Sequence, residues 1–249
     1  MDELGLVSVS FRSLTPEQVI AAAKNAGLTC IEWGSDVHAP CHDPARLRRI
    51  RAMQEAAGLT CCSYGTYFRI GVNKPEELTA YLDGAALLGT DILRLWCGPK
   101  GSDAYTPEER EDLYRQCREL ARMARDRGMT LCMECHNDTM TDRKEPALAL
   151  MEAVDSPAFL MYWQPNQNRT EEENLAYARL LAPYTTHLHV FNWKGTDKYP
   201  LAGAVALWRQ YRAAFAGDHK LLLEFMPDDR VESLPTETAA LRQIEEGRR

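Results

Sequence analysis

Residues 106–135 read TPEEREDLYRQCRELARMARDRGMTLCMEC, and they set the architecture expected of the whole chain. The opening threonine is followed by a proline and, three positions on, by a glutamate, which is the pattern of a capping box with proline in the first helical turn. Apolar residues then recur at helical spacing through 107–127, and Gly128 marks the end of that helix. The apolar run 129–135 has the length and composition of a buried strand. The stretch therefore predicts one complete unit of helix followed by strand.

The same alternation runs through the rest of the chain. Short apolar runs predict eight strands, at 4–11, 29–33, 59–65, 91–97, 129–135, 159–164, 186–193 and 220–226. Helical patterns separate them, and this strict alternation implies parallel strands joined by crossover helices. Eight near-equal units without a Gly-rich first turn favour a closed (β/α)8 TIM barrel over an open doubly wound sheet. No composition break interrupts residues 1–249, so we expect a single α/β domain.

Composition excludes several classes of protein. Of the 249 residues, 45% are hydrophobic and 26% are charged, which is enough to bury a core and excludes a disordered chain. The 29 basic and 36 acidic side chains give a net charge of −7 without a basic cluster, so we expect no nucleic-acid partner. No apolar run approaches the roughly 20 residues of a membrane span, and MDELGLVSVSF lacks the basic residues of a signal peptide. We therefore expect a cytoplasmic protein with no membrane partner.

Four predicted strands in succession end in a side chain that could bind a metal ion. Glu134 belongs to the fifth strand, Gln164 to the sixth, His189 to the seventh and Glu224 to the eighth. Each lies about one strand–helix unit beyond the last, so all four should reach the same level at the carboxyl end of the barrel, where barrel enzymes carry their active sites. Alternation along the strands predicts that these side chains point inward.

Inward carboxylates are costly in a barrel core unless a positive charge neutralises them, and a divalent cation is the simplest such charge. Three oxygen ligands and one imidazole suit Mn²⁺ above all, with Mg²⁺, Co²⁺ or Zn²⁺ as alternatives. A purely structural interpretation stays open. In it, Glu134 and Glu224 pair with inward cations such as Arg94, and His189 is an ordinary core histidine.

The chain resembles the xylose-isomerase-like TIM-barrel superfamily, which includes sugar phosphate isomerases and epimerases. The resemblance spans nearly the whole chain and rests on IEWGSDVH (31–38), SYGTYFR (63–69), LRLWCGPKGS (93–102), LCMECHNDTMTD (131–142), MYWQPNQN (161–168), HLHVFNW (187–193) and LLLEF (221–225). In that family, acidic residues of strands five, six and eight and a histidine of strand seven hold the metal. The resemblance therefore implies Glu134, Gln164, His189 and Glu224 as metal ligands, with the two glutamates as the acid/base pair.

Two positions depart from the family pattern. The family usually has Asp at the strand-six ligand position and often His three residues later, whereas this chain has Gln164 and Gln167. Gln164 can still bind a metal through its amide oxygen, but it removes one negative charge from the site. We therefore expect weaker metal affinity and a more electrophilic metal. Gln167 removes a proton carrier or a charged substrate contact.

The resemblance implies an enzyme of carbohydrate metabolism, and the charges of this set suggest a mechanism for it. A divalent cation would chelate the carbonyl and an adjacent hydroxyl of a sugar and stabilise the negative charge that develops on oxygen. One of Glu134 and Glu224 would remove the proton α to the carbonyl, and the other would return a proton. We thus expect a metal-dependent sugar or sugar phosphate isomerase or epimerase. The alternatives are a dehydratase or lyase acting on a keto-sugar or keto-inositol, and a catalytically impaired barrel that only binds sugar.

Further side chains at or just past the strand ends could contact a small-molecule carbohydrate substrate. Aromatic faces stack on the C–H faces of sugars, and polar groups grip hydroxyls. The candidates are Glu32, His38, Arg94, Trp96, His136, Gln167 and Trp193. The resemblance also leaves a homo-oligomer open, since barrels of this superfamily often form dimers or tetramers.

Overall fold

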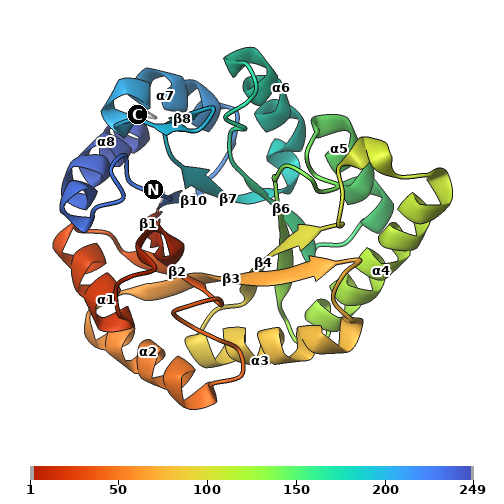
Figure 1. Ribbon diagram of the computed structural model, residues 1–249, viewed down its shortest axis with the longest axis horizontal. Helices are drawn as coiled ribbons and strands as arrows, with labels where there is room; N and C mark the ends of the chain where they lie inside the picture. The colour runs from red at the N-terminus through yellow and green to blue at the C-terminus, as the bar shows by residue number, and fades with distance from the viewer. Residues whose placement is uncertain (1–2, 248–249) are drawn as a thin grey trace.

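The strands of this chain form a closed, parallel, eight-stranded barrel with eight helices around it, as a computed structural model that describes residues 3–247 shows (Figure 1). Residues 1–2 and 248–249, the ends of the single domain predicted from the sequence, lie outside the described range. The barrel strands are β1 (Glu3–Val7), β2 (Cys30–Gly34), β3 (Thr60–Ile70), β4 (Ile92–Cys97), β5 (Thr130–Glu134), β6 (Phe159–Trp163), β7 (Thr185–Val190) and β10 (Lys220–Leu223). They follow one another around the barrel in chain order, and β10 closes it by pairing with β1. The predicted TIM barrel is confirmed.

The helices cover the outside of the barrel. They are α1 (Pro16–Asn25), α2 (Pro44–Ala56), α3 (Leu78–Leu88), α4 (Pro107–Arg125), α5 (Lys144–Val154), α6 (Glu171–Leu181), α7 (Val205–Ala213) and α8 (Leu234–Glu246). Short 3-10 turns lie at η1 (Ser8–Phe11), η2 (Pro75–Glu77), η3 (Ser102–Ala104), η4 (Ala182–Tyr184), η5 (Leu201–Ala204) and η6 (Val231–Ser233). Thr15, Thr106 and Thr170 form the predicted capping boxes, which satisfy otherwise unpaired N–H groups at the helix starts. No described helix is long and apolar enough to span a membrane.

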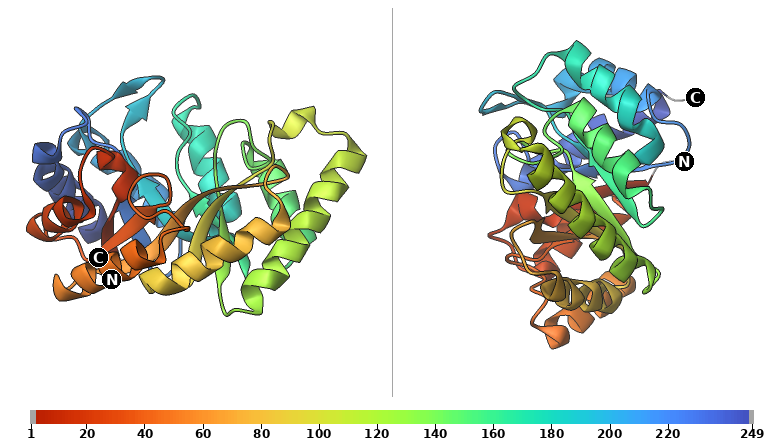
Figure 2. Two further views of the ribbon diagram at one scale, coloured as in Figure 1. Left: turned by 60° about the horizontal axis from the view of Figure 1, so that its bottom comes forward. Right: turned by 90° about the vertical axis from the view of Figure 1, so that its right-hand side faces the viewer.

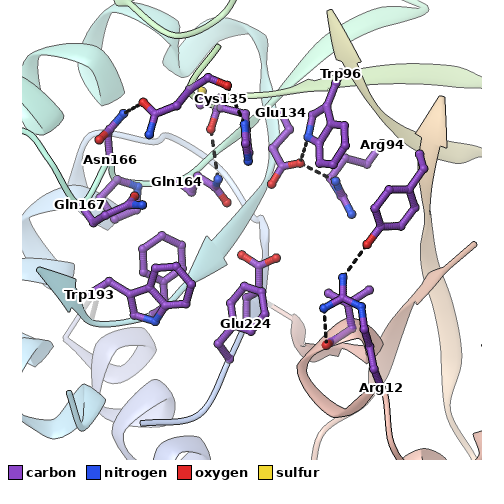
Figure 3. A pocket seen from close by; sticks show the side chains of 17 residues that line it. Arg12, Arg94, Trp96, Glu134, Cys135, Gln164, Asn166, Gln167, Trp193 and Glu224 are labelled. Atoms are coloured by element: carbon purple, nitrogen blue, oxygen red, sulfur yellow. Dashed lines mark hydrogen bonds and ion pairs between the residues drawn. The ribbon is translucent and has the colours of Figure 1, made fainter. Parts of the chain in front are cut away.

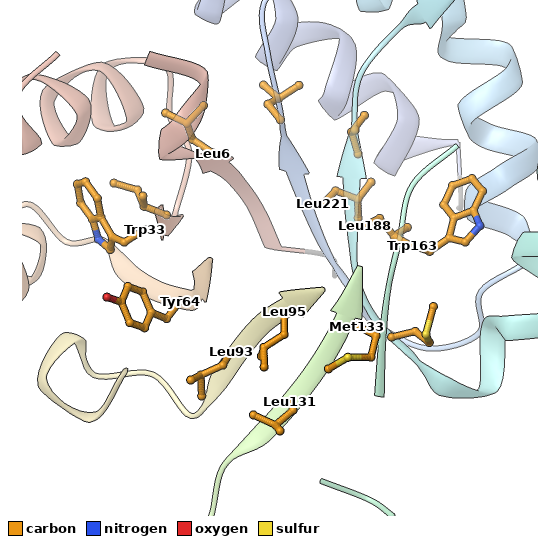
Figure 4. Close-up of a cluster of buried hydrophobic side chains, with 14 of the residues drawn as sticks. Leu6, Trp33, Tyr64, Leu93, Leu95, Leu131, Met133, Trp163, Leu188 and Leu221 are labelled. Atoms are coloured by element: carbon orange, nitrogen blue, oxygen red, sulfur yellow. The ribbon is translucent and has the colours of Figure 1, made fainter. Parts of the chain in front are cut away.

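The main hydrophobic core lies between the barrel and its helices (Figure 4). Leu93 and Leu95 of β4 are fully buried in this core, whereas Arg94 between them lines a cavity at the barrel mouth. Trp33 packs here as well, and its indole N–H donates to Gln54 Oε1 of α2 at 2.7 Å. The alternation of apolar outward and functional inward residues is what brings the site side chains into the barrel.

The structure corrects four predicted strand ends by three or more residues. Strand β1 stops at Val7, and residues 8–11 form the 3-10 turn η1 instead of continuing the strand. Serine hydroxyls explain the change, because Ser8 Oγ accepts from Gly34 N–H at 2.9 Å and Ser10 Oγ accepts from Phe225 N–H at 2.8 Å. Strand β3, by contrast, continues five residues past its predicted end, to Ile70.

The other corrections concern the last two barrel strands. Strand β7 ends at Val190, and β8 (Trp193–Lys194) and β9 (Asp197–Lys198) form a two-stranded antiparallel ribbon after it. Figure 2 shows this ribbon projecting beyond the rim of the barrel. Strand β10 ends at Leu223, and Phe225 has a φ of 59°, a conformation that is strained for a bulky residue. Phe225 therefore turns into the cavity at the barrel mouth.

Candidate active site

A cavity of about 290 Å³ opens at the carboxyl ends of the barrel strands (Figure 3). Its wall combines charged, aromatic and amide side chains, and we call it the mouth pocket. It is lined by Arg12, Tyr67, Arg94, Trp96, Glu134, His136, Asn137, Gln164, Asn166, Gln167, Phe191, Trp193, Glu224 and Phe225, among others. The carboxylates of Glu134 and Glu224 face each other across this space in Figure 3.

Three of the four predicted metal ligands, Glu134, Gln164 and Glu224, line the mouth pocket, and the fourth, His189, is buried against them. His189 Nδ1 lies 3.1 Å from Gln164 Oε1, 3.4 Å from Glu224 Oε2 and 3.6 Å from Glu134 Oε1. One ligand atom from each of Glu134, His189 and Glu224 lies within 4.8 Å of the others. Neighbouring ligand atoms around a six-coordinate ion bound at about 2.1 Å are about 3 Å apart. The four residues thus have the donor types and spacing that a hard divalent cation requires.

Neighbouring groups orient two of these ligands. The Gln164 amide N–H donates to the Cys135 carbonyl at 3.1 Å, which turns the amide oxygen toward His189. The other imidazole nitrogen, His189 Nε2, lies 3.4 Å from Glu32 Oε2, and that oxygen also accepts from the Ser63 hydroxyl at 2.7 Å. A carboxylate on the far nitrogen fixes a histidine tautomer and leaves the near nitrogen free for a metal.

Glu134 is held from a different side. Its Oε2 accepts from the Trp96 indole N–H at 2.6 Å and forms an ion pair with the Arg94 guanidinium. Arg94 also donates from Nε to Glu32 Oε1 at 2.8 Å. Burial alone would raise the pKa of Glu134, but the charges of Arg94 and His189 outweigh it and lower that pKa to about 2. Glu134 is therefore ionised at neutral pH and fixed in orientation.

The pairing of Glu134 with Arg94 matches one part of the purely structural interpretation, but the rest of the cluster differs from it. Within residues 3–247, the ion-pair neighbour of Glu224 is His189, not a lysine or an arginine. Burial would lower the pKa of His189, yet Glu224 and Glu32 raise it well above its ordinary value. The carboxylates thus favour protonation of the His189 imidazole, which places a positive charge beside Glu134 and Glu224. A bound metal ion would supply a positive charge at the same place.

Five of the predicted substrate contacts line the mouth pocket: Arg94, Trp96, His136, Gln167 and Trp193. Trp96 and His136 also pack on each other, with ring centroids 5.1 Å apart.

Glu32 and His38 do not line the mouth pocket, which corrects their prediction as substrate contacts. Glu32 is fully buried and bonds to Arg94, Ser63 and His189. His38 is also fully buried, because its loop folds back so that Nε2 reaches the Leu14 carbonyl at 3.0 Å. Burial lowers the pKa of His38, so its imidazole is neutral at pH 7. Glu32 thus orients Arg94 and His189, and His38 holds its loop against the Leu14 carbonyl.

Sequence reasoning missed several polar residues of the mouth pocket, among them Arg12 and Tyr67. Arg12 donates from Nη2 to the Tyr67 hydroxyl at 2.5 Å and from Nε to Asp36 Oδ2 at 2.7 Å. Arg12 follows the first predicted strand directly, so a cation just past a strand end was the signal available. Phe225 could not be found this way, because its place depends on a left-handed backbone angle.

About half of this chain is similar in sequence to a known dehydratase. The chain is 25% identical to the 3-dehydroshikimate dehydratase of Bacillus anthracis over 136 residues, which are 52% of this chain. The match spans 46% of that protein, so this chain corresponds to about half the length of its curated relative.

Solved structures resemble the whole barrel. The crystal structure of the probable 3-DHS dehydratase involved in petrobactin synthesis in Bacillus anthracis has a TM-score of 0.81 at 18% identity, over 97% of this chain and 99% of that one. A xylose isomerase-like TIM barrel protein from Mycobacterium smegmatis, in complex with magnesium, has a TM-score of 0.74 at 14% identity, covering 99% and 98%. The D-psicose 3-epimerase of Clostridium cellulolyticum H10 has a TM-score of 0.69 at 13% identity, covering 98% of each chain. At these identities the structures show the fold alone.

Family membership rests on the sequence match itself. The xylose isomerase-like TIM barrel family matches residues 20–240, which is most of the chain. The resemblance inferred from the strand-end motifs is thereby confirmed. This chain belongs to the xylose isomerase-like TIM barrel family.

Proposed function

We propose that this chain is a divalent-metal-dependent enzyme that converts a small sugar or sugar phosphate through an enediolate, as a sugar isomerase or epimerase. One observation carries the proposal. Glu134 and Glu224 face each other across the mouth pocket (Figure 3), and His189 Nδ1 lies within 3.6 Å of an oxygen atom of Glu134, Glu224 and Gln164. The magnesium complex of the Mycobacterium relative supports a divalent cation, and we propose Mn²⁺ or Mg²⁺ from the oxygen-rich ligand set.

Each residue then has a defined role. Glu134, Gln164, His189 and Glu224 would hold the cation, which would supply Lewis-acid stabilisation of negative charge on a substrate oxygen. Glu224 would remove the proton α to the substrate carbonyl, because among residues 3–247 its carboxylate has no hydrogen-bond donors comparable to the Arg94 and Trp96 groups that bind Glu134. Glu134 would deliver a proton taken up from solvent to the opposite face of the enediolate, and Glu224 would release its proton to solvent, which completes epimerisation; delivery to the neighbouring carbon completes isomerisation.

The remaining wall of the mouth pocket would hold the substrate. Trp96 and Trp193 offer aromatic faces for the C–H face of a sugar, and His136 and Gln167 offer polar atoms for its hydroxyls. Arg94 contacts Glu134, one of the two proposed proton-transfer residues, as well as Glu32, and it could also stabilise charge on a substrate oxygen.

A second candidate is dehydration of a keto-sugar, keto-inositol or related hydroxy-ketone. Glu134 Oε2 already accepts from two donors, and its other oxygen faces His189, so few lone pairs remain to receive a substrate proton. One base is enough for elimination: Glu224 removes the α-proton, and a β-hydroxyl leaves with a proton as water. Similarity to the 3-dehydroshikimate dehydratase of Bacillus anthracis also favours this candidate.

Solvent isotope exchange tests the proposal and separates the two candidates. The Mg²⁺-loaded protein would be incubated in D₂O with D-psicose, D-tagatose, D-fructose, L-ribulose and 3-dehydroshikimate, and followed by proton NMR. An isomerase or epimerase introduces deuterium at the α-carbon of a ketose, whereas a dehydratase yields an unsaturated product that absorbs in the ultraviolet. Glu224→Gln should abolish either reaction, and Glu237→Gln, outside the mouth pocket, should not. A metal-loaded protein that neither exchanges nor converts any of these compounds would contradict the proposal.

A further inference from the structure

The mouth pocket continues sideways into two further hollows on the same rim of the barrel. A middle hollow of about 270 Å³ shares Asn166, Gln167 and Trp193 with the mouth pocket. An outer hollow of about 610 Å³ shares Asn192 and Lys194 with the middle one. The three hollows therefore form a row that leads from the metal ligands, past the β8–β9 ribbon, toward helix α7.

The row carries unused polar groups beside aromatic rings. Within the described part of the chain, the Gln167 side-chain amide and the Lys194 ammonium make no hydrogen bond or ion pair with another residue. Trp193 lies in the shared wall of the mouth pocket and the middle hollow, and Tyr199 lines the outer hollow with 44% of its surface exposed. Aromatic faces next to hydrogen-bonding side chains are suited to sugar rings, which have apolar C–H faces and polar edges.

Charge in the row favours a neutral ligand. Lys194 and Glu171 both line the middle and outer hollows, so one positive and one negative side chain offset each other there. Arg169, which lines the middle hollow, already donates to the Asp142 carbonyl at 2.5 Å. A phosphate would meet the Glu171 carboxylate in this space, whereas hydroxyl groups can bond to both charges.

The volumes of the hollows also favour a ligand larger than one sugar ring. The mouth pocket alone is at the low end of the roughly 300–1,000 Å³ that small-molecule sites occupy, so one sugar ring fills it. The outer hollow is more than twice as large and would be left empty by a free monosaccharide. A ligand that uses the row needs a group beyond its first ring, and the aromatic and polar lining of the row fits a second sugar ring.

We propose that the substrate is a glycoside, whose reacting sugar occupies the mouth pocket and whose second, neutral sugar ring lies in the row beyond Gln167 and Trp193, beside Lys194 and Tyr199. The identity of the reacting sugar rests on the proposed function. The second-ring subsite rests only on the row itself, since its residues are not among the metal ligands.

Calorimetric titration of the Mg²⁺-loaded protein tests this subsite. The probes are D-fructose, D-fructose 6-phosphate and glucosyl-fructoses linked through O3, O4 or O6 of the fructose ring. We expect at least one glucosyl-fructose to bind about tenfold more tightly than fructose. Lys194→Ala and Tyr199→Ala should remove this gain and leave the fructose Kd unchanged, and Lys24→Ala, an exposed lysine on α1, should have no effect.

Other results would overturn the inference. It fails if no glucosyl-fructose binds more tightly than fructose, or if the two variants weaken fructose and glucosyl-fructose alike. It also fails if the phosphorylated sugar alone shows the gain, which would make Lys194 a phosphate contact. A two-ring gain that persists on metal-free protein, without isotope exchange, would keep the subsite and refute the proposed chemistry.

Discussion

The two carboxylate oxygens of Glu134 have different partners, which gives them different roles. Its Oε2 is occupied by the Trp96 indole N–H and the Arg94 guanidinium, while Oε1 faces His189 Nδ1 at 3.6 Å. Glu224, the opposite carboxylate, has no such pair of donors among the described residues, so it retains more freedom to accept a proton. The two carboxylates look equivalent in the sequence. They differ in the structure because the neighbouring strand β4 supplies Glu134 with two donors, Arg94 and Trp96.

The indole N–H of Trp96 should therefore control metal affinity without touching the metal. Trp96→Phe removes the donor to Glu134 Oε2 and keeps most of the aromatic surface. Loss of such a supporting hydrogen bond lowers metal affinity on the order of tenfold. Calorimetric titration of the variant with Mn²⁺ should show this loss. Trp193→Phe, in the same pocket but without a bond to a ligand, serves as the matched control. Equal affinities for the parent and Trp96→Phe would contradict this role.

Residue types and spacing predicted the four candidate metal ligands, but they could not separate substrate contacts from supporting residues. Glu32 lies near the carboxyl end of its predicted strand, as a metal ligand or substrate contact would, and strand alternation predicts that its side chain points into the barrel. It is nevertheless fully buried, because Arg94, Ser63 and His189 surround it. Those partners come from three other strands, and a single sequence does not reveal which of them meet.

At the scale of elements, periodicity and capping located the strands and helices, while their ends depended on distant contacts. The helix starts at Thr15, Thr106 and Thr170 were predictable because the capping residues are local in sequence. The turn after Leu223 was not, because it rests on Ser10 Oγ, more than 200 residues away. The β8–β9 ribbon was also missed, since two-residue strands carry too little pattern to be recognised.

Helix α8 contains a buried carboxylate that should make stability depend on pH. Burial raises the pKa of Glu237 above its ordinary 4.5, and the bond from Leu201 N–H at 2.8 Å offsets this only in part. The folded state therefore binds the Glu237 proton more tightly than the unfolded state. The stability that this proton contributes is present below pH 4.5 and is lost as pH rises through the raised folded value.

Glu237→Gln isolates that contribution, because the amide oxygen can still accept from Leu201 but cannot ionise. Relative to the parent, the variant should gain unfolding free energy as pH increases from 4 to 8. Urea denaturation at several pH values would measure the difference. Glu108→Gln, an exposed residue of α4, is the control and should follow the parent. Parallel curves for Glu237→Gln and the parent would show that Glu237 titrates alike in both states.

For the whole molecule, the repeated strand–helix unit predicted both the fold and the location of the site. Once eight units close, the carboxyl ends of the strands must meet at one mouth, so residues about one unit apart converge there. The distances between the site side chains and the orientation of their hydrogen-bond donors could not be predicted, because they depend on contacts between different strands. The row of hollows beside the mouth pocket is also a property of the assembled barrel, since α6, α7 and the ribbon all contribute to its wall.

The convergence of Glu134, Gln164, His189 and Glu224 on one divalent cation is tested most directly by thermal unfolding of chelator-treated protein titrated with Mn²⁺ and Mg²⁺. A ligand that binds only the folded state adds about 2.7 kcal/mol at a hundredfold excess over its Kd. We predict that the parent and His42→Ala, which alters an exposed histidine, gain thermal stability with the ion. His189→Ala and Gln164→Ala should gain little or none. If no ion stabilises the parent, or if all four proteins are stabilised alike, the cation does not bind at this mouth.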